Sequence, residues 1–352
     1  MSKVWSFRQK TATPLRIMPR SAWSGKVDRL RSVLISPWVS RIASFLFTCL
    51  IASIIIFLIL RLLPGDVADL IAGDVISAPE FKEAVRSELG LDQPLYVQYG
   101  NWLLSIISGN FGGSSLISGQ PIGELLARQI PVTILLATGV VLLSLVTGLP
   151  LGIAAAMKKD RWPDTVIRLM VVPGQSLPGF WLAIICLLML AAVFKWSPPL
   201  VYSFPWQDPW NHFQMIIIPL LLLTWEYGSH IVRVTRSGIA AAMQEDQIRA
   251  LRAKGLTERQ IIIHHALRAA APSLIATMAL QFGVLLGGVM ILESIFGLPG
   301  VGRGLIGAAL QRDLPVIQTY VLLIVAVVLL VNLAADRLHR AADPRLPSGA
   351  GL

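Results

Sequence analysis

Long apolar runs separated by short polar segments dominate the pattern of this chain. A helix needs roughly 20 consecutive apolar residues to cross about 30 Å of hydrocarbon. Six runs reach that length, and spans are predicted at Ile42–Leu60, Val132–Met157, Leu169–Phe194, Phe213–Val232, Leu274–Phe296 and Val316–Ala335. We therefore expect an all-α polytopic membrane protein with six transmembrane helices.

Composition and charge agree with this expectation. The chain has 352 residues, of which 55% are hydrophobic and only 14% are charged, whereas a soluble domain has about 25% charged residues. The net charge of +10 is typical of nucleic-acid binding too, but its distribution favours the positive-inside rule. If the N-terminus is cytoplasmic, 23 of the 30 Lys and Arg residues fall in cytoplasmic segments. The pattern predicts both termini in the cytoplasm and no nucleic-acid partner.

The segments outside the spans suggest a simple organisation. Residues 1–41 are predicted to be a basic cytoplasmic tail, and residues 42–352 a transmembrane domain. The largest outer loop covers about 61–131, with a helix expected at Ala78–Leu89 and glycine-rich turns after Gly109. The largest cytoplasmic loop covers about 233–272.

The third predicted span contains two Pro-Gly pairs, at Pro173–Gly174 and Pro178–Gly179. Prolines remove backbone donors, and lipid tolerates this only where neighbouring helices or a cavity satisfy the freed groups. The pattern fits either a kink that serves packing or a bend where a pathway opens and closes.

The most informative segment is Gln247–Pro272, which contains five Arg and Lys residues between two apolar runs. A first helix is expected to end near Lys254, with Gly255 in the left-handed conformation and Leu256 folded back in a Schellman ending. Thr257 and Gln260 have the spacing of a capping box that starts a second helix. Leu256 and Ile261 have the spacing of a hydrophobic staple. The prediction is a helix–Gly255–helix elbow, with Pro272 marking the start of the fifth span.

Three other interpretations of this elbow compete with a role in binding a partner, and two of them are disfavoured. It has the pattern of an amphipathic helix lying on anionic lipid. A DNA-binding helix-turn-helix is disfavoured, because both ends are attached to membrane spans. A metal site at His264 and His265 is also disfavoured, because adjacent helix residues point about 100° apart and no third ligand is near in sequence.

The elbow resembles the coupling loop of importer-type ABC permeases. Its form is similar to that of the dipeptide/oligopeptide/nickel branch, approximately Arg-x-Ala-Arg-Ala-Lys-Gly-Leu followed by His-Ala-Leu-Arg. The matching positions are Arg249, Arg252, Ala253, Lys254, Gly255, Leu256, His265, Ala266, Leu267 and Arg268. Leu251 departs from the small residue that is usual there.

The resemblance covers most of the chain from about Ile42 onward. LGLDQPLYVQY at Leu89–Tyr99 and GNFGGS at Gly109–Ser114 are similar to this branch's outer loop. PGFWLAIICLLML in the third span, LESIFGLPGVGRGL after the fifth and RDLPVIQ beyond it are similarly typical. The order of these motifs resembles that of a B-type permease subunit.

The resemblance implies a type I ABC importer (MetI-like) permease fold in a bacterial inner membrane. It implies four kinds of partner: a second homologous permease subunit, two cytoplasmic ATP-binding subunits, an extracytoplasmic solute-binding protein and membrane lipid. It also assigns ATPase coupling to the elbow residues Arg249, Ala250, Leu251, Arg252, Ala253, Lys254, Gly255 and Leu256. The chain has no Gly-x-x-x-x-Gly-Lys-Ser/Thr phosphate loop, so no cofactor is expected in it and ATP and Mg are assigned to the partner ATPase.

Acidic side chains inside spans suggest a second group of functional residues. Glu226, His230 and Arg233 lie on one face of the fourth span, and charge within a span usually faces protein or water. This group fits either a polar cluster that holds helices together or a lining of the substrate path. Glu293 ends the fifth span and is predicted to lie next to a gate.

Two other classes of function are weighed against the permease. A membrane-embedded enzyme would need convergent catalytic groups, and only Glu226 and His230 approach that. A secondary transporter would ordinarily show matching halves with equivalent broken helices, and no repeat is visible. Short peptides are the expected substrate, with nickel chelates or another small solute, including glutathione-like compounds, as alternatives.

Overall fold

The computed structural model describes residues 37–62 and 92–342. The predicted tail, apart from residues 37–41, and the predicted helix at Ala78–Leu89 lie outside the described residues. By its internal contacts the chain divides into two units, residues 1–46 and 47–352. Helix α2 begins in the first unit and ends in the second, and the remaining helices belong to the second.

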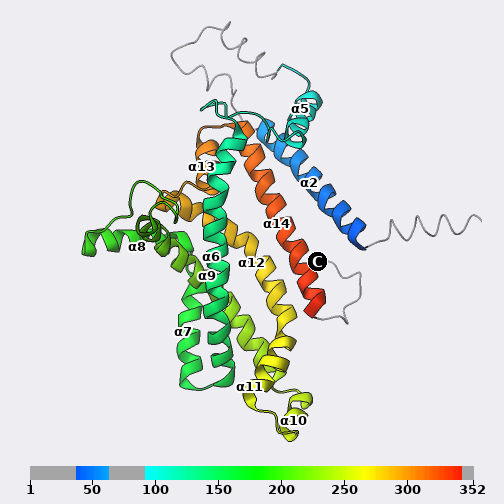
Figure 1. Cartoon of the computed structure of the whole chain (residues 1–352), viewed down its shortest axis with the longest axis vertical. Coiled ribbons are helices and arrows are strands. Elements are labelled where there is room, and N and C mark those ends of the chain that lie inside the picture. Colours follow the sequence, from blue (N-terminus) through cyan, green and yellow to red (C-terminus); the bar gives the residue numbers. More distant parts are fainter. Residues whose placement is uncertain (1–36, 63–91, 343–352) are drawn as a thin grey trace, which may run out of the picture. The chain divides into compact units, whose positions relative to one another are not determined.

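The second unit is built mainly from helices (Figure 1). In chain order, and including α2, the elements are α2 (Pro37–Leu62), α5 (Leu95–Ile107), α6 (Ile122–Met157), α7 (Trp162–Ser176), α8 (Gly179–Phe194), α9 (Pro209–Ala242), α10 (Asp246–Ala253), α11 (Glu258–Ile261), the π-helical turn η1 (Ile262–Ala266), α12 (Leu267–Phe296), α13 (Val301–Leu310) and α14 (Leu314–Ala342). The prediction of an all-α membrane protein is confirmed.

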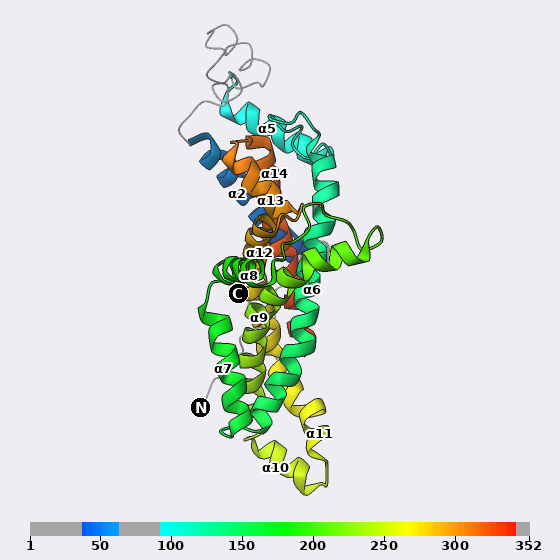
Figure 2. The ribbon, with the colours of Figure 1, turned by 90° about the vertical axis from the view of Figure 1, so that its left-hand side faces the viewer.

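Five of the six predicted spans correspond to single long apolar helical segments. The third corresponds to two helices, α7 and α8, whose axes differ by 102°, so α8 projects sideways (Figures 1 and 2). Leu177 between them is extended at φ −93° and ψ 131°, because a residue before proline is pushed out of the helical region. Pro178 then precedes the first turn of α8. The Pro178–Gly179 pair therefore marks a break rather than a mild kink, whereas Pro173 and Gly174 lie inside α7.

The predicted cytoplasmic loop at 233–272 is mostly helix, which corrects its boundaries. Helix α9 continues without a breaker to Ala242, and the segment from Glu258 to Phe296 is one continuous apolar span. Pro272 lies inside α12, so it does not mark a boundary as expected. Ala270 and Leu274 are buried on either side of it, and this packing outweighs the single hydrogen bond that the proline removes.

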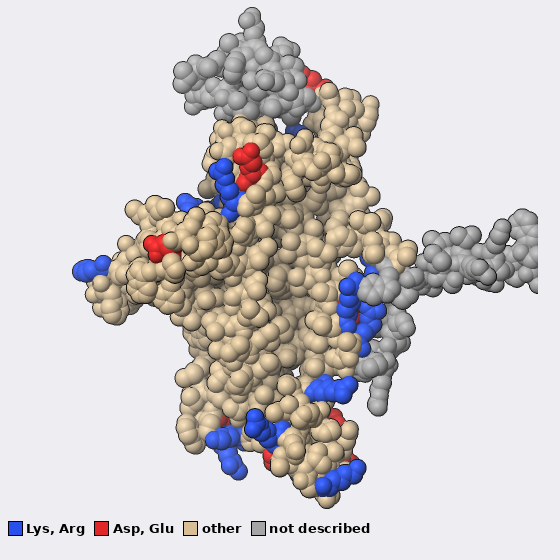
Figure 3. All heavy atoms as spheres, in the orientation of Figure 1, with Lys and Arg blue, Asp and Glu red and all other residues tan. Residues whose placement is uncertain are grey.

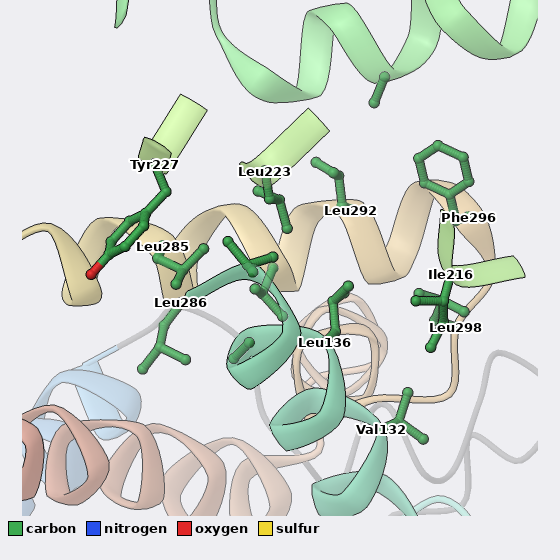
Figure 4. Close-up of a cluster of buried hydrophobic side chains, with 14 of the residues drawn as sticks. Val132, Leu136, Ile216, Leu223, Tyr227, Leu285, Leu286, Leu292, Phe296 and Leu298 are labelled. Carbon is green, nitrogen blue, oxygen red and sulfur yellow. The ribbon is translucent and has the colours of Figure 1, made fainter. Parts of the chain in front are cut away.

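The core of the unit lies where α6, α9 and α12 meet (Figure 4). Its fully buried members include Val132 and Leu136 from α6, Leu223 from α9, and Val289 and Leu292 from α12. These positions recur at helical spacing, so each helix presents one apolar face to the other two.

Small residues bring α6 and α9 close together. Ser144 lies beside Gly228, and Gly152 lies so close to α9 that an added Cβ would sit 2.6 Å from the Cβ of Thr235. Close approach through Gly and Ser is the usual basis of helix packing inside membranes, where no hydrophobic effect drives helices together.

The connections gather at two ends of this unit. The α10–α11 elbow and the α6–α7 turn lie at one end, here named the elbow end (Figures 1 and 2). Helix α13 and the start of α6 lie at the opposite end. Gly109, Gly112, Gly113 and Gly119 all have positive φ, which confirms the turn-rich segment expected before α6.

Candidate functional site

The first half of the elbow ends as the sequence predicted. Gly255 has φ +82°, a left-handed conformation that glycine adopts without a steric cost. The Leu256 N–H donates to the Leu251 carbonyl at 3.3 Å, and the Gly255 N–H donates to the Arg252 carbonyl at 2.9 Å. These two bonds make a Schellman motif, so the predicted ending of α10 is confirmed.

The second half begins with the predicted capping box. The Gln260 N–H donates to the Thr257 hydroxyl at 3.4 Å, and the Thr257 N–H donates to the Gln260 side-chain oxygen at 3.0 Å. Each side chain therefore satisfies a backbone donor that the first helical turn leaves free.

An ion pair braces the two halves across Gly255. Arg252 Nε donates to Glu258 Oε1 at 2.7 Å, and Arg252 Nη2 donates to Oε2 at 3.3 Å. This hydrogen bond raises the pKa of Arg252 above its ordinary value. The pair was not foreseen from the sequence. The six-residue spacing belongs to no regular helical pair, and only the reversal of direction at Gly255 brings the groups together.

Buried apolar side chains attach the elbow to the long helices. Ile248 and Ile261 are buried, and Ala266 and Ala270 pack with Ile239 near the end of α9 and against Ile153 near the end of α6. An added Cβ at Gly238 would sit 2.7 Å from the Cβ of Ala270, so α9 and α12 are in close contact just beneath the elbow. The elbow is therefore in packing contact with α6, α9 and α12.

The outward face of the elbow is polar and open. Arg249, Ala250, Arg252, Ala253, Lys254 and Gly255 are exposed, whereas Leu251 and Leu256 are half-buried. Lys and Arg side chains gather at this end, and the middle of the face in view is mostly uncharged (Figure 3). An added Cβ at Gly255 would have no neighbour within 4 Å. This face is free to meet another chain at close range.

The two histidines of the elbow lie in the π-helical turn. His264 is exposed, and its Nδ1 is 3.2 Å from the Gln260 carbonyl oxygen. His265 is half-buried and lines a cavity of about 480 Å³ with Arg268 and Glu245. Within residues 37–62 and 92–342, no group of three His, Cys, Asp or Glu side chains lies close enough to hold a metal ion.

The structure brings together two of the three polar residues expected on the fourth span. Glu226 and His230 line one small cavity of about 20 Å³, together with Gln281 of α12. The buried Nδ1 of His230 has no hydrogen-bond partner among the described residues, and the Glu226 carboxylate lies against Gly179 at the start of α8. Arg233 is exposed and does not line this cavity. Glu226 therefore sits at the break between α7 and α8.

Glu293 is fully buried and caps a helix. Its Oε1 accepts from the Thr133 hydroxyl at 2.6 Å, and its Oε2 accepts from the Gly302 and Arg303 N–H groups at 2.8 and 3.3 Å. The carboxylate thus lies at the N-terminus of α13, where free donors and the helix dipole favour a negative charge. The Thr133 hydroxyl also accepts from the Val301 N–H at 2.9 Å. Glu293 holds α6, α12 and α13 together.

A buried ion pair near the elbow end was not predicted from the sequence. Asp164 of α7 has no exposed surface, and it accepts two hydrogen bonds from Arg236 of α9 at 2.6 and 2.7 Å. The Asp160 N–H also donates to Asp164 at 3.0 Å. A charged residue in the first turn of a short helix is ordinary, so nothing in the local pattern distinguishes Asp164 from a solvated side chain.

Family comparisons match this architecture along nearly the whole chain. The family described as binding-protein-dependent transport system inner membrane component matches residues 148–347, and the N-terminal part of the same kind of component matches residues 34–137. The chain belongs to this family. It is a multi-pass inner-membrane permease component of a transport system, and the resemblance carried by the elbow motif is confirmed.

Individual relatives agree with the family. A putative peptide transport system permease protein of Brucella abortus is 38% identical over 308 residues, covering 88% of this chain and 98% of the relative. A glutathione transport system permease protein of Salmonella choleraesuis is 37% identical, covering 88% and 97%. The inward-facing MetNI methionine ABC transporter aligns with a TM-score of 0.50 at 22% identity, covering 63% of this chain and 98% of that one. This last likeness supports the expected MetI-like permease fold.

Proposed function

We propose that this permease forms half of the translocation path of an ATP-driven, binding-protein-dependent importer of di- and oligopeptides. The observation on which the proposal rests is the elbow, whose open polar face is attached rigidly to three membrane helices. The names of the relatives support peptides as the substrate class, and the glutathione relatives are consistent with a short peptide too.

The proposed complex contains one further homologous permease, two cytoplasmic ATP-binding subunits and an extracytoplasmic solute-binding protein, surrounded by membrane lipid. The elbow end faces the cytoplasm in this arrangement, and both termini lie there. The charge asymmetry supports this orientation, because Lys and Arg concentrate in the segments on the cytoplasmic side. ATP and Mg bind to the partner ATPase, since no phosphate-binding loop occurs in this chain.

The elbow residues Arg249 to Leu256 act as the contact through which ATPase motion reaches the membrane. The Schellman motif, the capping box and the Arg252–Glu258 pair each remove freedom from the turn. A rigid elbow passes a displacement to α9 and α12 instead of absorbing it. The basic groups of Arg249 and Lys254 complement acidic or dipolar groups on the ATPase, and Gly255 lets the two backbones approach closely.

Glu226 and His230 are proposed to line the substrate path at the α7–α8 break. A half-buried carboxylate without a partner in the described residues is costly in a membrane, and contact with the ammonium group of a peptide would offset that cost. Glu293 and Arg233 are not proposed as path residues, because the first serves as a helix cap and the second lies outside the cavity.

Uptake by the reconstituted complex with its binding protein tests this function. Proteoliposomes containing ATP should accumulate labelled di- and tripeptides and not a nickel chelate. The expected result for Gly255→Val is normal membrane insertion and subunit assembly with loss of both peptide uptake and ATPase stimulation by the loaded binding protein. The matched control is Gly109→Val, at a glycine that also has a positive φ, of +86°, and no described neighbour within 4 Å of an added Cβ. Normal uptake in Gly255→Val would refute the coupling role, and nickel uptake without peptide uptake would refute the substrate class.

A further inference from the structure

A cavity of about 330 Å³, with both polar and apolar side chains in its walls, lies at the end of the unit opposite to the elbow. Its walls come from four stretches of chain: the segment at Ser115–Ser118, the start of α6, helix α13 and the start of α14. Small-molecule sites in proteins occupy about 300–1,000 Å³, so this cavity has the size of a site for a small ligand. In the proposed orientation it faces the side from which substrate arrives.

Two buried polar atoms in the cavity have no hydrogen-bond partner among the described residues. Tyr320 is fully buried, and its hydroxyl makes no hydrogen bond within the described residues. The side-chain oxygen of Gln129 is likewise buried and unpartnered there. Buried polar groups are nearly always hydrogen-bonded, because leaving one unsatisfied costs about 1–3 kcal/mol. Both residues line the cavity, and a bound polar molecule would satisfy them.

The cavity also presents charges of both signs. Arg303 lines it and uses one guanidinium nitrogen to donate to the Gly297 carbonyl, which leaves further N–H donors available. Asp313 lines it as well, accepting from the Ser115 hydroxyl at 2.5 Å and the Leu116 N–H at 3.2 Å. A carboxylate can accept about four hydrogen bonds, so Asp313 retains acceptor capacity.

The glycines of α13 allow close packing at one point of this wall and leave open space at another. Gly304 lies beneath Gln129 and Tyr320, where an added Cβ would sit 2.9 Å from the Tyr320 ring. Gly307 lies one turn further along, and an added Cβ there would meet nothing within 4 Å. Gly307 lines the cavity, so a larger side chain at this position would enter the cavity without displacing a neighbour.

We propose that this cavity is a transit site for a short zwitterionic peptide, in which Arg303 binds the terminal carboxylate and Asp313 the terminal ammonium group. The Tyr320 hydroxyl and the Gln129 side chain bind the peptide's amide groups. The assignment rests on the proposed peptide-import function. It favours a free peptide over a loop of another protein, because only a free peptide offers one charged group of each sign at its two ends.

Equilibrium binding of labelled L-alanyl-L-alanine to the assembled permease–ATPase complex in nanodiscs, without binding protein, tests the site. Saturable binding is expected, and capping either end by N-acetylation or C-amidation should weaken it about tenfold or more, since each cap removes a charge-assisted hydrogen bond. Tyr320→Phe should weaken it severalfold without lowering the melting temperature, because the hydroxyl has no partner to lose within the described residues. Gly307→Val should abolish this binding. Gly100→Val should leave it unchanged, because Gly100 is also a helical glycine with no described neighbour within 4 Å of an added Cβ, and it does not line the cavity.

Absence of saturable binding, equal binding of capped and free peptides, or wild-type binding by Gly307→Val would each overturn the site. These results are independent of the import function, which uptake with the binding protein and ATP measures separately. A complex that takes up peptide normally and binds none here would refute the cavity site and leave the importer intact.

Discussion

Arg236 of α9 binds Asp164 of α7 through two hydrogen bonds of 2.6 and 2.7 Å, and the Asp164 side chain is fully buried. Arg236 lies on the same helix as Glu226 and shortly before the elbow. The pair therefore fixes α7, the first half of the bent α7–α8 segment, to the helix that leads into the elbow. This ion pair ties the position of α7 to that of α9.

Asp164→Asn should destabilise the protein by on the order of 3 kcal/mol. Removing one partner of a buried pair leaves the other charge uncompensated, which costs more than the pair itself contributes. The melting temperature in mild detergent, measured by the loss of the monodisperse chromatographic peak, should fall clearly. Asp160→Asn is the matched control, because Asp160 is exposed and asparagine tolerates its positive φ of 61°. Equal melting temperatures for the two variants would contradict the assignment.

Glu293→Ala should lower the melting temperature more than Glu293→Gln. Alanine leaves the Gly302 and Arg303 N–H groups and the Thr133 hydroxyl without their acceptor, at about 1–3 kcal/mol for a buried unsatisfied group. Glutamine keeps one oxygen for the backbone donors, and it loses the charge at the start of α13 and the acceptor of the Thr133 hydroxyl. Glu124→Gln serves as control, since its side chain is 61% exposed and its ion pair with Arg128 is long, at 3.8 Å. If Glu293→Ala had the same melting temperature as the control variant, the carboxylate would not be the cap that joins these helices.

Gly152→Ala and Gly100→Ala should have opposite effects on stability. Alanine normally favours a helix over glycine by roughly 1 kcal/mol, and Gly100 has open space for the added methyl. At Gly152 the new Cβ would lie 2.6 Å from the Thr235 Cβ and 3.0 Å from the Val232 carbonyl oxygen. The two helices must move apart, and such overpacking costs about 1–3 kcal/mol. Melting curves of the two variants against wild type measure the difference, and a stabilised Gly152→Ala would refute close α6–α9 packing.

The sequence is most informative where local rules act alone. Gly255, Leu256 and Thr257 determine the elbow through hydrogen bonds between near neighbours, so its Schellman motif and capping box follow from residue types and spacing. The six spans are located by their apolar length for the same reason. The ends of the helices are not located in this way, because a helix can continue beyond the apolar run, as α9 does to Ala242.

Contacts between distant elements escape prediction. Asp164 pairs with a residue 72 positions away, and Glu293 caps a helix that begins only after a tight turn. Both depend on how helices pack, which neither charge nor periodicity encodes locally. Pro272 shows the converse. Proline locally favours a helix end, yet Pro272 lies inside α12, between the buried side chains of Ala270 and Leu274. The spacing of Glu226, His230 and Arg233 predicts one helix face, yet only Glu226 and His230 line the same cavity.

Reversing the Arg252–Glu258 pair distinguishes bracing of the elbow from direct charge contact with the ATPase. Both side chains are about half exposed, and an exposed pair contributes at most about 1 kcal/mol, so Arg252→Glu and Glu258→Arg alone should barely change the melting temperature. Each should nevertheless reduce ATPase stimulation by the loaded binding protein, because two like charges now face each other across Gly255. The double reversal restores an ion pair of opposite polarity and should recover most of the stimulation. If the double variant were as impaired as Arg252→Glu alone, the positive charge at position 252 would itself contact the ATPase, and bracing would not be its role.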